Sequence, residues 1–396
     1  MCNNNGHCRK FDAGTMCPSY RATRDEAHLT RGRANTLRLA LSGQLGPDAD
    51  SMVKAALELC VSCKGCRREC PTGVDMARMK IEFLAQYRKS NGLGLRDRAV
   101  AFLPRYAQLA AAAAPLANLA TRLFGSFAGF TPERPLPAWR RERFVDGAWG
   151  KSGAREVVLL VDTFNRYFEP ENVRAAIRVL QAAGYRVHAA APVEGARPLC
   201  CGRTFLSAGL VDEARVEAKR VLDALTPWLA HGVPIIGLEP SCLFTLRDEY
   251  GVLLSGTEAL AKNSFLFEEF LANEANAGRL NLKLKAVESE ALLHGHCHQK
   301  AFATMGAVEQ VLRLVPDLKV RTIESSCCGM AGSFGYEAEH YEVSMKMGEA
   351  SLLPAVRAAA AGTLIVADGT SCRHQIAHGA KRQALHVARV LERALA

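Results

Sequence analysis

The 396-residue sequence lacks the marks of fibrous, disordered and disulfide-rich proteins. It has no sustained heptad of apolar residues and no excess of glycine (32) or proline (16), which excludes coiled-coil and collagen-like chains. Its 14 cysteines are too few for a disulfide scaffold of this length. Because 49% of the residues are apolar and 23% are charged, the chain can bury ordinary cores, and its length favours two or three domains.

The sequence also lacks any block of five basic residues, although its formal net charge is +10. Residues 1–150 contain 23 lysines and arginines against 13 acidic residues, whereas residues 151–396 contain 27 of each. This asymmetry predicts two modules of different charge. A basic nucleic-acid binder is the weaker interpretation, because no aromatic residues interleave with the basic ones. An anionic cofactor held among cysteines would also favour basic surroundings, so we expect no nucleic-acid partner.

Long hydrophobic runs are absent as well. The most apolar stretch, Tyr106–Thr121, contains Pro115 and is too short and too interrupted to span a bilayer. We expect an alanine-rich linker helix packed on the protein there. The alternative is a helix that docks on a partner or associates peripherally with the inner face of the membrane. No secretory signal pattern opens the chain, so we expect a cytoplasmic protein whose thiols serve metals or redox chemistry.

Four of the cysteines form a dense run, Cys60-x2-Cys63-x2-Cys66-x3-Cys70-Pro71. This is the spacing of bacterial ferredoxins, in which the first three cysteines bind one iron–sulfur cluster and the fourth binds a different one. A zinc site usually has two separated pairs of cysteines instead. The run therefore predicts a 4Fe-4S cluster, and a non-redox zinc or metal-binding module for structure or partner binding is the alternative.

The first cluster needs a fourth thiolate, and Cys17-Pro18 repeats the Cys-Pro element of the run. We predict a complete 4Fe-4S site made of Cys17, Cys60, Cys63 and Cys66. An incomplete second site is then left with Cys2, Cys8 and Cys70. It is incomplete because Asn5 stands where the run has its second cysteine. This second site could hold a second iron–sulfur cluster, another metal or nothing, and His7 is a weak candidate ligand.

The other cysteines follow predicted strands. Cys-Cys-Gly occurs twice, and each copy is followed by one further cysteine after a strand. Ligands of parallel α/β sheets gather at the carboxyl ends of the strands, so both sets are candidate metal sites. The fuller set, in the second copy, consists of Cys297, Cys327, Cys328 and Cys372. The weaker set, in the first copy, consists of Cys200, Cys201 and Cys242.

One position distinguishes the two sets, because Thr163 stands in the first copy where the second has Cys297. Three histidines, His294, His296 and His298, flank that cysteine. Residues two apart after a strand face alike, so His296 and His298 could ligate a metal or bind a carboxylate substrate. These two are the weak catalytic candidates, and a polar strand end with capping histidines is the alternative.

The order of predicted elements supports a modular fold. From residue 155 onward, strands alternate with helices, and the same order recurs after about 130 residues. This predicts an α-helical ferredoxin-like iron–sulfur module followed by a tandem repeat of two α/β Cys-Cys-Gly domains with parallel sheets. The expected boundaries are the helical module at 1–90, a helical and proline-rich linker at 91–150, and repeats at 151–285 and 286–396.

Several of these motifs together resemble a known family. They are the spaced Cys2, Cys8 and Cys17-Pro-Ser-Tyr, then Thr30-Arg-Gly-Arg33, the ferredoxin run, His294-Gly-His-Cys-His-Gln299 and Ser326-Cys-Cys-Gly-Met-Ala-Gly-Ser-Phe-Gly335. Over nearly its whole length the chain resembles the iron–sulfur half of fused FAD-linked oxidases of the D-2-hydroxyglutarate and D-lactate dehydrogenase type. More distantly it is similar to the iron–sulfur subunits of glycolate oxidase and anaerobic glycerol-3-phosphate dehydrogenase, and to the Cys-Cys-Gly domains of heterodisulfide reductase.

The resemblance implies an electron-transfer component of an FAD-dependent D-2-hydroxy-acid dehydrogenase. No Gly-x-Gly-x-x-Gly motif opens a helix, so FAD is expected on a partner domain or subunit, and this chain is not expected to be catalytic alone. We expect the chain to be one subunit of a complex or the C-terminal half of a longer protein. It would pass electrons from reduced flavin to a quinone, a cytochrome or a soluble carrier.

Overall fold

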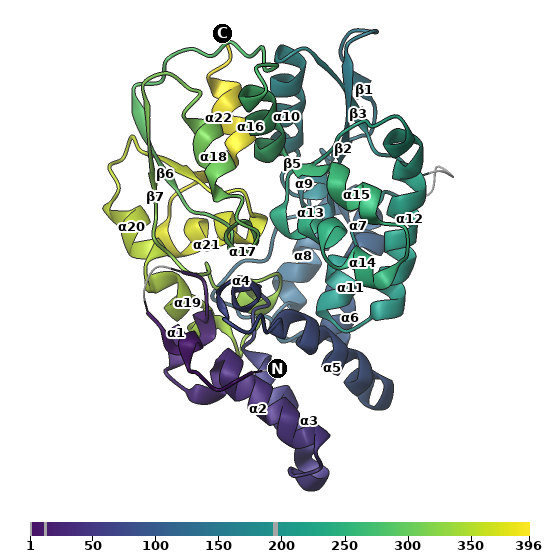
Figure 1. Cartoon of the computed structure of the whole chain (residues 1–396), viewed down its shortest axis with the longest axis vertical. Helices are drawn as coiled ribbons and strands as arrows, with labels where there is room; N and C mark the ends of the chain where they lie inside the picture. Colours follow the sequence, from purple (N-terminus) through teal and green to yellow (C-terminus); the bar gives the residue numbers. More distant parts are fainter. Residues whose placement is uncertain (1, 12–13, 193–196) are drawn as a thin grey trace.

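The computed structural model describes residues 2–11, 14–192 and 197–396. They form a helical module, a group of linker helices and two α/β halves (Figure 1). In that view the helical module lies at the bottom. The first α/β half lies above it on the right, and the second lies above it on the left.

The helical module consists of short helices around a core that combines sulfur and aliphatic side chains. Leu29, Leu57 and Met76 lie in this core, and each is at most 1% exposed. The core also contains cysteines, so the packing of the module and the position of its thiols depend on one another. Its elements are η1 (His7–Arg9), α1 (Pro18–Thr23), η2 (Glu26–His28), α2 (Thr30–Leu41), η3 (Gly46–Asp48), α3 (Ala49–Glu58), α4 (Gly65–Glu69) and α5 (Met76–Asn91).

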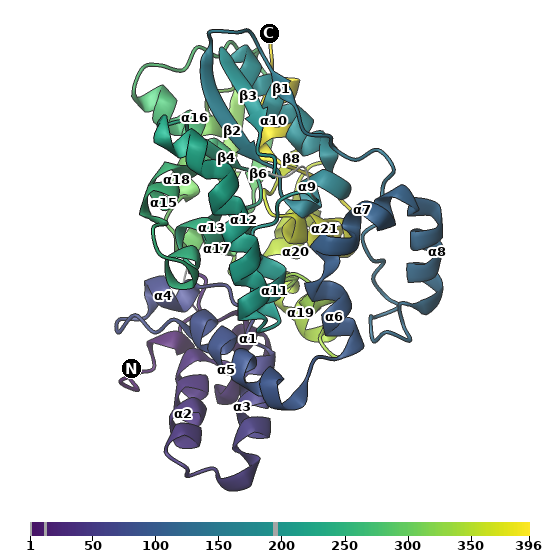
Figure 2. The same cartoon turned by 90° about the vertical axis from the view of Figure 1, so that its right-hand side faces the viewer.

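The linker contains α6 (Leu95–Ala101), α7 (Leu103–Ala112) and α8 (Ala114–Phe124). The alanine-rich stretch predicted as one packed helix is therefore two, and they meet at Ala113. Helix α7 buries Ala107 and Ala111 against Trp139. Helix α8 leaves Leu116 and Leu123 exposed, and it lies at the edge of the molecule in Figure 2.

The first sheet has the strand order β1-β3-β2-β4-β5, and its pairs are parallel except for β1 with β3. Val157, Val158 and Leu159 of β2 are fully buried, as expected for a strand covered on both faces. The elements are β1 (Ala148–Trp149), β2 (Arg155–Leu160), α9 (Thr163–Tyr167), α10 (Pro170–Ala182), β3 (Tyr185–Ala189), α11 (Arg203–Ser207), α12 (Val211–Ala230), β4 (Ile235–Gly237), α13 (Pro240–Arg247), α14 (Tyr250–Leu253), α15 (Glu258–Asn263), β5 (Ser264–Leu266) and α16 (Phe267–Asn276).

The second sheet is wholly parallel, with the order β7-β6-β8-β9. Its central strand β6 buries Ala291, Leu292 and Leu293 completely. The elements are β6 (Ser289–Leu293), α17 (Cys297–Ala301), α18 (Met305–Leu312), β7 (Leu318–Thr322), η4 (Phe334–Tyr336), α19 (Tyr341–Glu349), α20 (Leu352–Ala358), β8 (Leu364–Val366), α21 (Thr370–Ala380), β9 (Ala384–Leu385) and α22 (Val387–Arg393).

The two sheets match in strand order, because β3-β2-β4-β5 corresponds to β7-β6-β8-β9. They share one hydrophobic core, in which Val157 of β2 and Leu293 of β6 both lie. Helix α10 packs against α22, and α16 packs against α18, so helices of both halves fill the space between the sheets. The two halves therefore cannot shift relative to one another without exposing this core.

The cysteine-bearing loops lie at the carboxyl ends of the strands, on the side where the helical module packs. Cys297 follows β6, Cys327 follows β7 and Cys372 follows β8. Helix α4 of the module contacts α17, which begins at Cys297. No helix in the described part of the chain has the length and apolar character needed to cross a membrane.

Candidate iron–sulfur and metal centres

One cavity in the helical module is lined by four cysteines, Cys17, Cys60, Cys63 and Cys66. These are the four predicted to hold the complete cluster. The loop curls around the cavity because Ser62 and Lys64 have left-handed backbone angles (φ 48° and 59°). Gly65 permits close packing there, because a Cβ at this position would lie 2.9 Å from the Cβ of Thr15.

Two N–H groups point at sulfur atoms of this cavity. Arg33 Nη1 lies 3.4 Å from Cys17 Sγ, and the backbone N–H of Met76 donates to Cys66 Sγ at the same distance. Arg33 is only 1% exposed, and its Nε and Nη2 donate to Ala56 O and Ser19 Oγ. The arginine is thus held rigidly against the thiols.

The electrostatics of the cavity favour a cation among the thiols. The pKa of Cys66 is raised to about 12, chiefly by burial, with Cys60 and Cys17 adding to the rise and the Met76 N–H opposing it. Burial also raises the pKa of Cys63 well above its usual value, and Cys17 and Cys327 add to that effect. Thiols in this position ionise readily only when metal ions offset their mutual repulsion, so the donor set fits an iron–sulfur cluster.

Of the three cysteines of the incomplete site, Cys8 lies in the core of the same module, and Cys2 and Cys70 are partly buried against it. Burial raises the pKa of Cys8, and the electrostatic effects of Cys17 and Cys2 add to the rise. Burial opposes ionisation of Cys70, but the Thr72 hydroxyl and nearby backbone N–H groups outweigh burial and lower its pKa. His7 is exposed, and Asn5 Oδ1 accepts a hydrogen bond from its backbone N–H.

The cysteines of the second half form a continuous set of sulfur atoms next to the first cavity. The Cys297 thiol lies beside that of Cys327, and their contact raises the pKa of Cys297 together with burial. Cys328 in turn lies between Cys327 and Cys372. Cys63 belongs to the same buried cluster of side chains. The structure thus brings Cys63 of the ferredoxin run and the second Cys-Cys-Gly set into one buried cluster.

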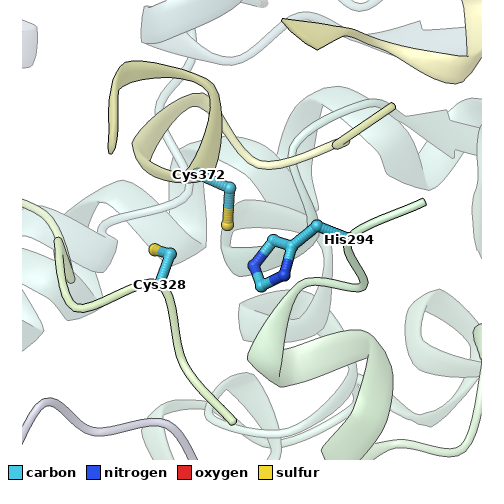
Figure 3. Close-up of side chains that lie close together, drawn as sticks. All are labelled: His294, Cys328 and Cys372. Atoms are coloured by element: carbon cyan, nitrogen blue, oxygen red, sulfur yellow. The ribbon is translucent and has the colours of Figure 1, made fainter. Parts of the chain in front are cut away.

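The histidines near Cys297 lie differently from the strand-like arrangement that their spacing suggested. His296 caps α17, and its Nδ1 accepts from the backbone N–H of His298. The two rings are nearly perpendicular, with centroids 5.1 Å apart. His298 Nε2 lies 3.1 Å from Ser62 O in the cluster loop. His294 is the histidine that lies beside cysteines, close to Cys328 and Cys372 (Figure 3).

The first half brings its own three cysteines together. Cys201 lies between Cys200 and Cys242, and all three are buried. Thr163 begins α9 as Cys297 begins α17, but its neighbour Asp162 caps that helix through the N–H groups of Phe164 and Asn165. Burial, reinforced by Glu239, raises the pKa of Asp162 to about 6. The first set therefore has a capping carboxyl group where the second has His296, and Thr163 where the second has its fourth thiol.

A buried lysine attaches the cluster loop to the first half. Lys64, which lies between Cys63 and Cys66, ion-pairs with Asp248 and Glu249 and is 1% exposed. Arg203 also pairs with Glu249, at 2.7 Å. The Lys64 ammonium is therefore neutralised by acids, unlike the guanidinium of Arg33.

Comparison with known proteins assigns both groups of cysteines to domains. Residues 1–74 match the 4Fe-4S dicluster domain, and residues 291–377 match the cysteine-rich domain. Cys2, Cys8 and the ferredoxin run fall within the dicluster domain, whereas Cys297, Cys327, Cys328 and Cys372 fall within the cysteine-rich domain.

Three of the curated relatives of the chain are an oxidoreductase and two subunits of oxidoreductases. The chain is 27% identical to D-2-hydroxyglutarate dehydrogenase of Escherichia coli K12, over 95% of this chain and 41% of that protein. It is 27% identical to one subunit of anaerobic glycerol-3-phosphate dehydrogenase from the same organism, over 72% of this chain and 73% of that subunit. A probable glycolate oxidase iron–sulfur subunit of Bacillus subtilis is 26% identical, over 93% of this chain and 87% of that subunit. The chain thus spans about two fifths of the length of the D-2-hydroxyglutarate dehydrogenases that it matches.

Three residues of the site, Arg33, Lys64 and His294, are not singled out by the cysteine spacing. A signal for His294 exists in the sequence, at the ends of two corresponding predicted strands. His294 precedes Cys297 by three residues, and Leu160 precedes Thr163 by three. An aliphatic residue is expected at the end of a buried strand, so a histidine there indicates a special role. Arg33 and Lys64 give no comparable signal, because single basic residues are usually exposed.

Proposed function

We propose that this chain is the iron–sulfur electron-transfer component of an FAD-dependent D-2-hydroxy-acid dehydrogenase of the D-2-hydroxyglutarate or D-lactate class. The observation that carries the proposal is that Cys17, Cys60, Cys63 and Cys66 line one cavity, and that Cys63 belongs to the same buried cluster as the cysteines of the second half. The names of the relatives supply the substrate class, and the words "iron-sulfur subunit" in one of them support a further subunit as partner. That this partner binds FAD follows from the resemblance to FAD-linked oxidases.

In this proposal the four cysteines hold a 4Fe-4S cluster, which supplies one-electron redox chemistry between a two-electron flavin and an acceptor. The protein holds the thiols close together, keeps water away from them and places Arg33 against Cys17. The set at Cys2, Cys8 and Cys70 is assigned to a second, incomplete cluster or metal site. The acceptor is a quinone, a cytochrome or a soluble carrier, reached with or without peripheral membrane association.

Electrons would have a short path between the four-cysteine site and the second Cys-Cys-Gly set. Cys63 and Cys327 belong to one buried cluster, and the Cys297 thiol lies beside that of Cys327. His298 adds a second contact, because its ring meets the carbonyl of Ser62 in the cluster loop. A metal in the second Cys-Cys-Gly set would therefore lie next to the cluster. His296 and His298 stay as the candidates for binding a substrate carboxylate near this route.

We also propose that the two α/β halves are tandem copies of one Cys-Cys-Gly unit, at 151–285 and 286–396, after a helical module at 1–90 and a linker at 91–150. The matched strand order supports this division. The first copy keeps Cys200, Cys201 and Cys242 but has Thr163 in place of the fourth thiol. We assign the stronger metal site to the second copy for that reason.

The first test is spectroscopic. The full chain purified without oxygen should contain iron and acid-labile sulfide and should give an EPR signal on reduction. Cys63→Ser should lose that signal, whereas Ser62→Ala in the same loop should keep it. A chain that holds zinc without sulfide would support the non-redox metal-binding module instead, and Cys63→Ser with unchanged iron would refute the ligand assignment.

The second test addresses the substrate class. The chain should be co-expressed with a candidate FAD-binding partner and treated anaerobically with D-2-hydroxyglutarate, D-lactate or their L enantiomers. A D acid should bleach the visible absorption of the cluster, and the L enantiomer should not. Reduction of the flavin while the cluster stays oxidised would contradict the electron-transfer role.

A further inference from the structure

The second half contains a donor set that differs from the four-cysteine set predicted there. His294, Cys328 and Cys372 each offer one ligand atom, and these atoms all lie within 4.8 Å of one another. All three side chains are buried, with exposed fractions of 1%, 4% and 1%. They come from the end of β6, the loop after β7 and the start of α21, so the fold itself brings them together (Figure 3).

The hydrogen bonds of Ser325 fit a His294 ring that carries its proton on Nδ1. Ser325 Oγ donates to Ile323 O at 3.5 Å and accepts from Lys300 Nζ at 3.2 Å. Its own proton is thus engaged, so it accepts the 2.9 Å hydrogen bond from His294 Nδ1. With the proton on Nδ1, Nε2 of the neutral ring carries a free lone pair. A metal-bound histidine is oriented in this way by a partner of its other nitrogen.

Within the described part of the chain, His294 Nε2 is buried and has no hydrogen-bond partner. An unpaired polar atom in the interior costs free energy, which a ligand or metal would recover. Figure 3 shows the outer edge of the imidazole ring turned toward the two sulfur atoms, away from its own backbone. The free lone pair therefore faces the thiols.

A buried cation lies close to one of these thiols. Arg134 is 2% exposed, and Cys328 is among the charges that act on it. Among the residues that the structure describes, its hydrogen bonds go to uncharged groups on Met330, Gly335, Ser344, Met345 and Gln375. The charge of this buried arginine would partly offset the negative charge of two metal-bound thiolates.

We propose that His294 Nε2, Cys328 Sγ and Cys372 Sγ bind one mononuclear metal ion of the zinc class, and that Cys297 and Cys327 are not its ligands. One imidazole and two thiolates are a donor set that zinc favours. Three protein ligands leave one position for a water or a small ligand. The inference refines the metal site that the proposed function gives to the second half, but it does not depend on electron transfer.

The test begins with the unaltered full chain, purified without oxygen and analysed for zinc, iron and sulfide. X-ray absorption at the zinc edge should show two sulfur neighbours at about 2.3 Å and lighter atoms at about 2.0 Å. Four sulfur neighbours would overturn the proposal. The proposal would also be overturned if the chain is purified without zinc and binds no added Zn²⁺ or Co²⁺ at this site.

Variants then assign the ligands. His294→Gln and Cys372→Ser should each lose the bound zinc, whereas Cys297→Ser should keep it. Ser325→Ala should weaken zinc binding by roughly 10–100-fold, because it removes the partner that orients the ring. Retained zinc in His294→Gln together with lost zinc in Cys297→Ser would contradict the assignment.

The iron and sulfide of the Cys17, Cys60, Cys63 and Cys66 site serve as the internal control for folding and for the proposed function. A variant that keeps them is folded, so its loss of zinc reports the site alone. Where a variant loses zinc together with iron and sulfide, the X-ray absorption result on the unaltered chain decides instead. If iron and sulfide are absent from every preparation but the two-sulfur zinc signal is present, the electron-transfer proposal fails and this one stands.

Discussion

Arg33 should set the reduction potential of the cluster that we assign to the helical module. Its guanidinium is buried, lies 3.4 Å from Cys17 Sγ, and donates its other hydrogen bonds to the uncharged oxygens of Ala56 and Ser19. Two unit charges at that distance interact by about 5 kcal/mol at an effective dielectric constant of about 20. An added electron spreads over the whole cluster and lies further away on average, so we take about half of that value. For a one-electron couple, about 2–3 kcal/mol corresponds to a potential roughly 100 mV more negative in Arg33→Gln.

The assay is a potentiometric titration of the anaerobic chain followed by EPR. Arg33→Lys should recover much of the potential, because it keeps the charge. Arg31→Gln is the matched control on the same helix, since Arg31 pairs with Glu26 at 2.6 Å and not with a thiol. If Arg33→Gln retains its iron and sulfide but has the potential of the unaltered chain, the electrostatic reasoning is refuted.

Further predictions concern stability and the metal sites. Lys64→Met should lower the free energy of unfolding in urea by about 3 kcal/mol, because it leaves Asp248 and Glu249 buried with fewer partners. Lys54→Met, at an exposed position, should have little effect. The buried pair with Arg373 lowers the pKa of Glu169 to about 2, against the opposing effect of burial. The ionised Glu169 therefore adds to the free energy of unfolding above pH about 4.5, and this contribution is lost as the pH falls toward 2. Over that window, the free energy of unfolding should fall less steeply with decreasing pH in Glu169→Gln than in the unaltered chain, whereas Glu171→Gln should not change this slope. Gly329→Ala should reduce zinc binding, because Gly329 lies beside Cys328 with φ 88° and a Cβ there would lie 2.9 Å from Met347 Cβ. Gly362→Ala should be tolerated, because a Cβ at Gly362 has no atom within contact distance.

Spacing in the sequence is sufficient to predict the parts of the site that neighbouring residues build. The ferredoxin run predicts three thiols at one cavity, and Cys17-Pro18 supplies the fourth. The parallel sheets follow from alternating strand and helix patterns, with unbroken apolar runs such as Val157–Val161. These features depend on local periodicity, which a single sequence carries.

Contacts between distant segments lie beyond such reasoning. The meeting of Cys63 with Cys327, and of Lys64 with Asp248, depends on how the helical module packs on the α/β halves. The break of the alanine-rich stretch at Ala113 also has only a weak signal, in Pro115. A strand period favours His296 and His298 over His294, but that period does not hold there because Cys297 begins a helix.

The most direct test of the central claim is a count of iron and acid-labile sulfide in the unaltered chain, prepared without oxygen, with zinc measured in the same sample. We expect about four irons and four sulfides or more per chain, and an EPR signal on reduction that is lost in Cys63→Ser. Zinc at the four-cysteine cavity with no sulfide would contradict it.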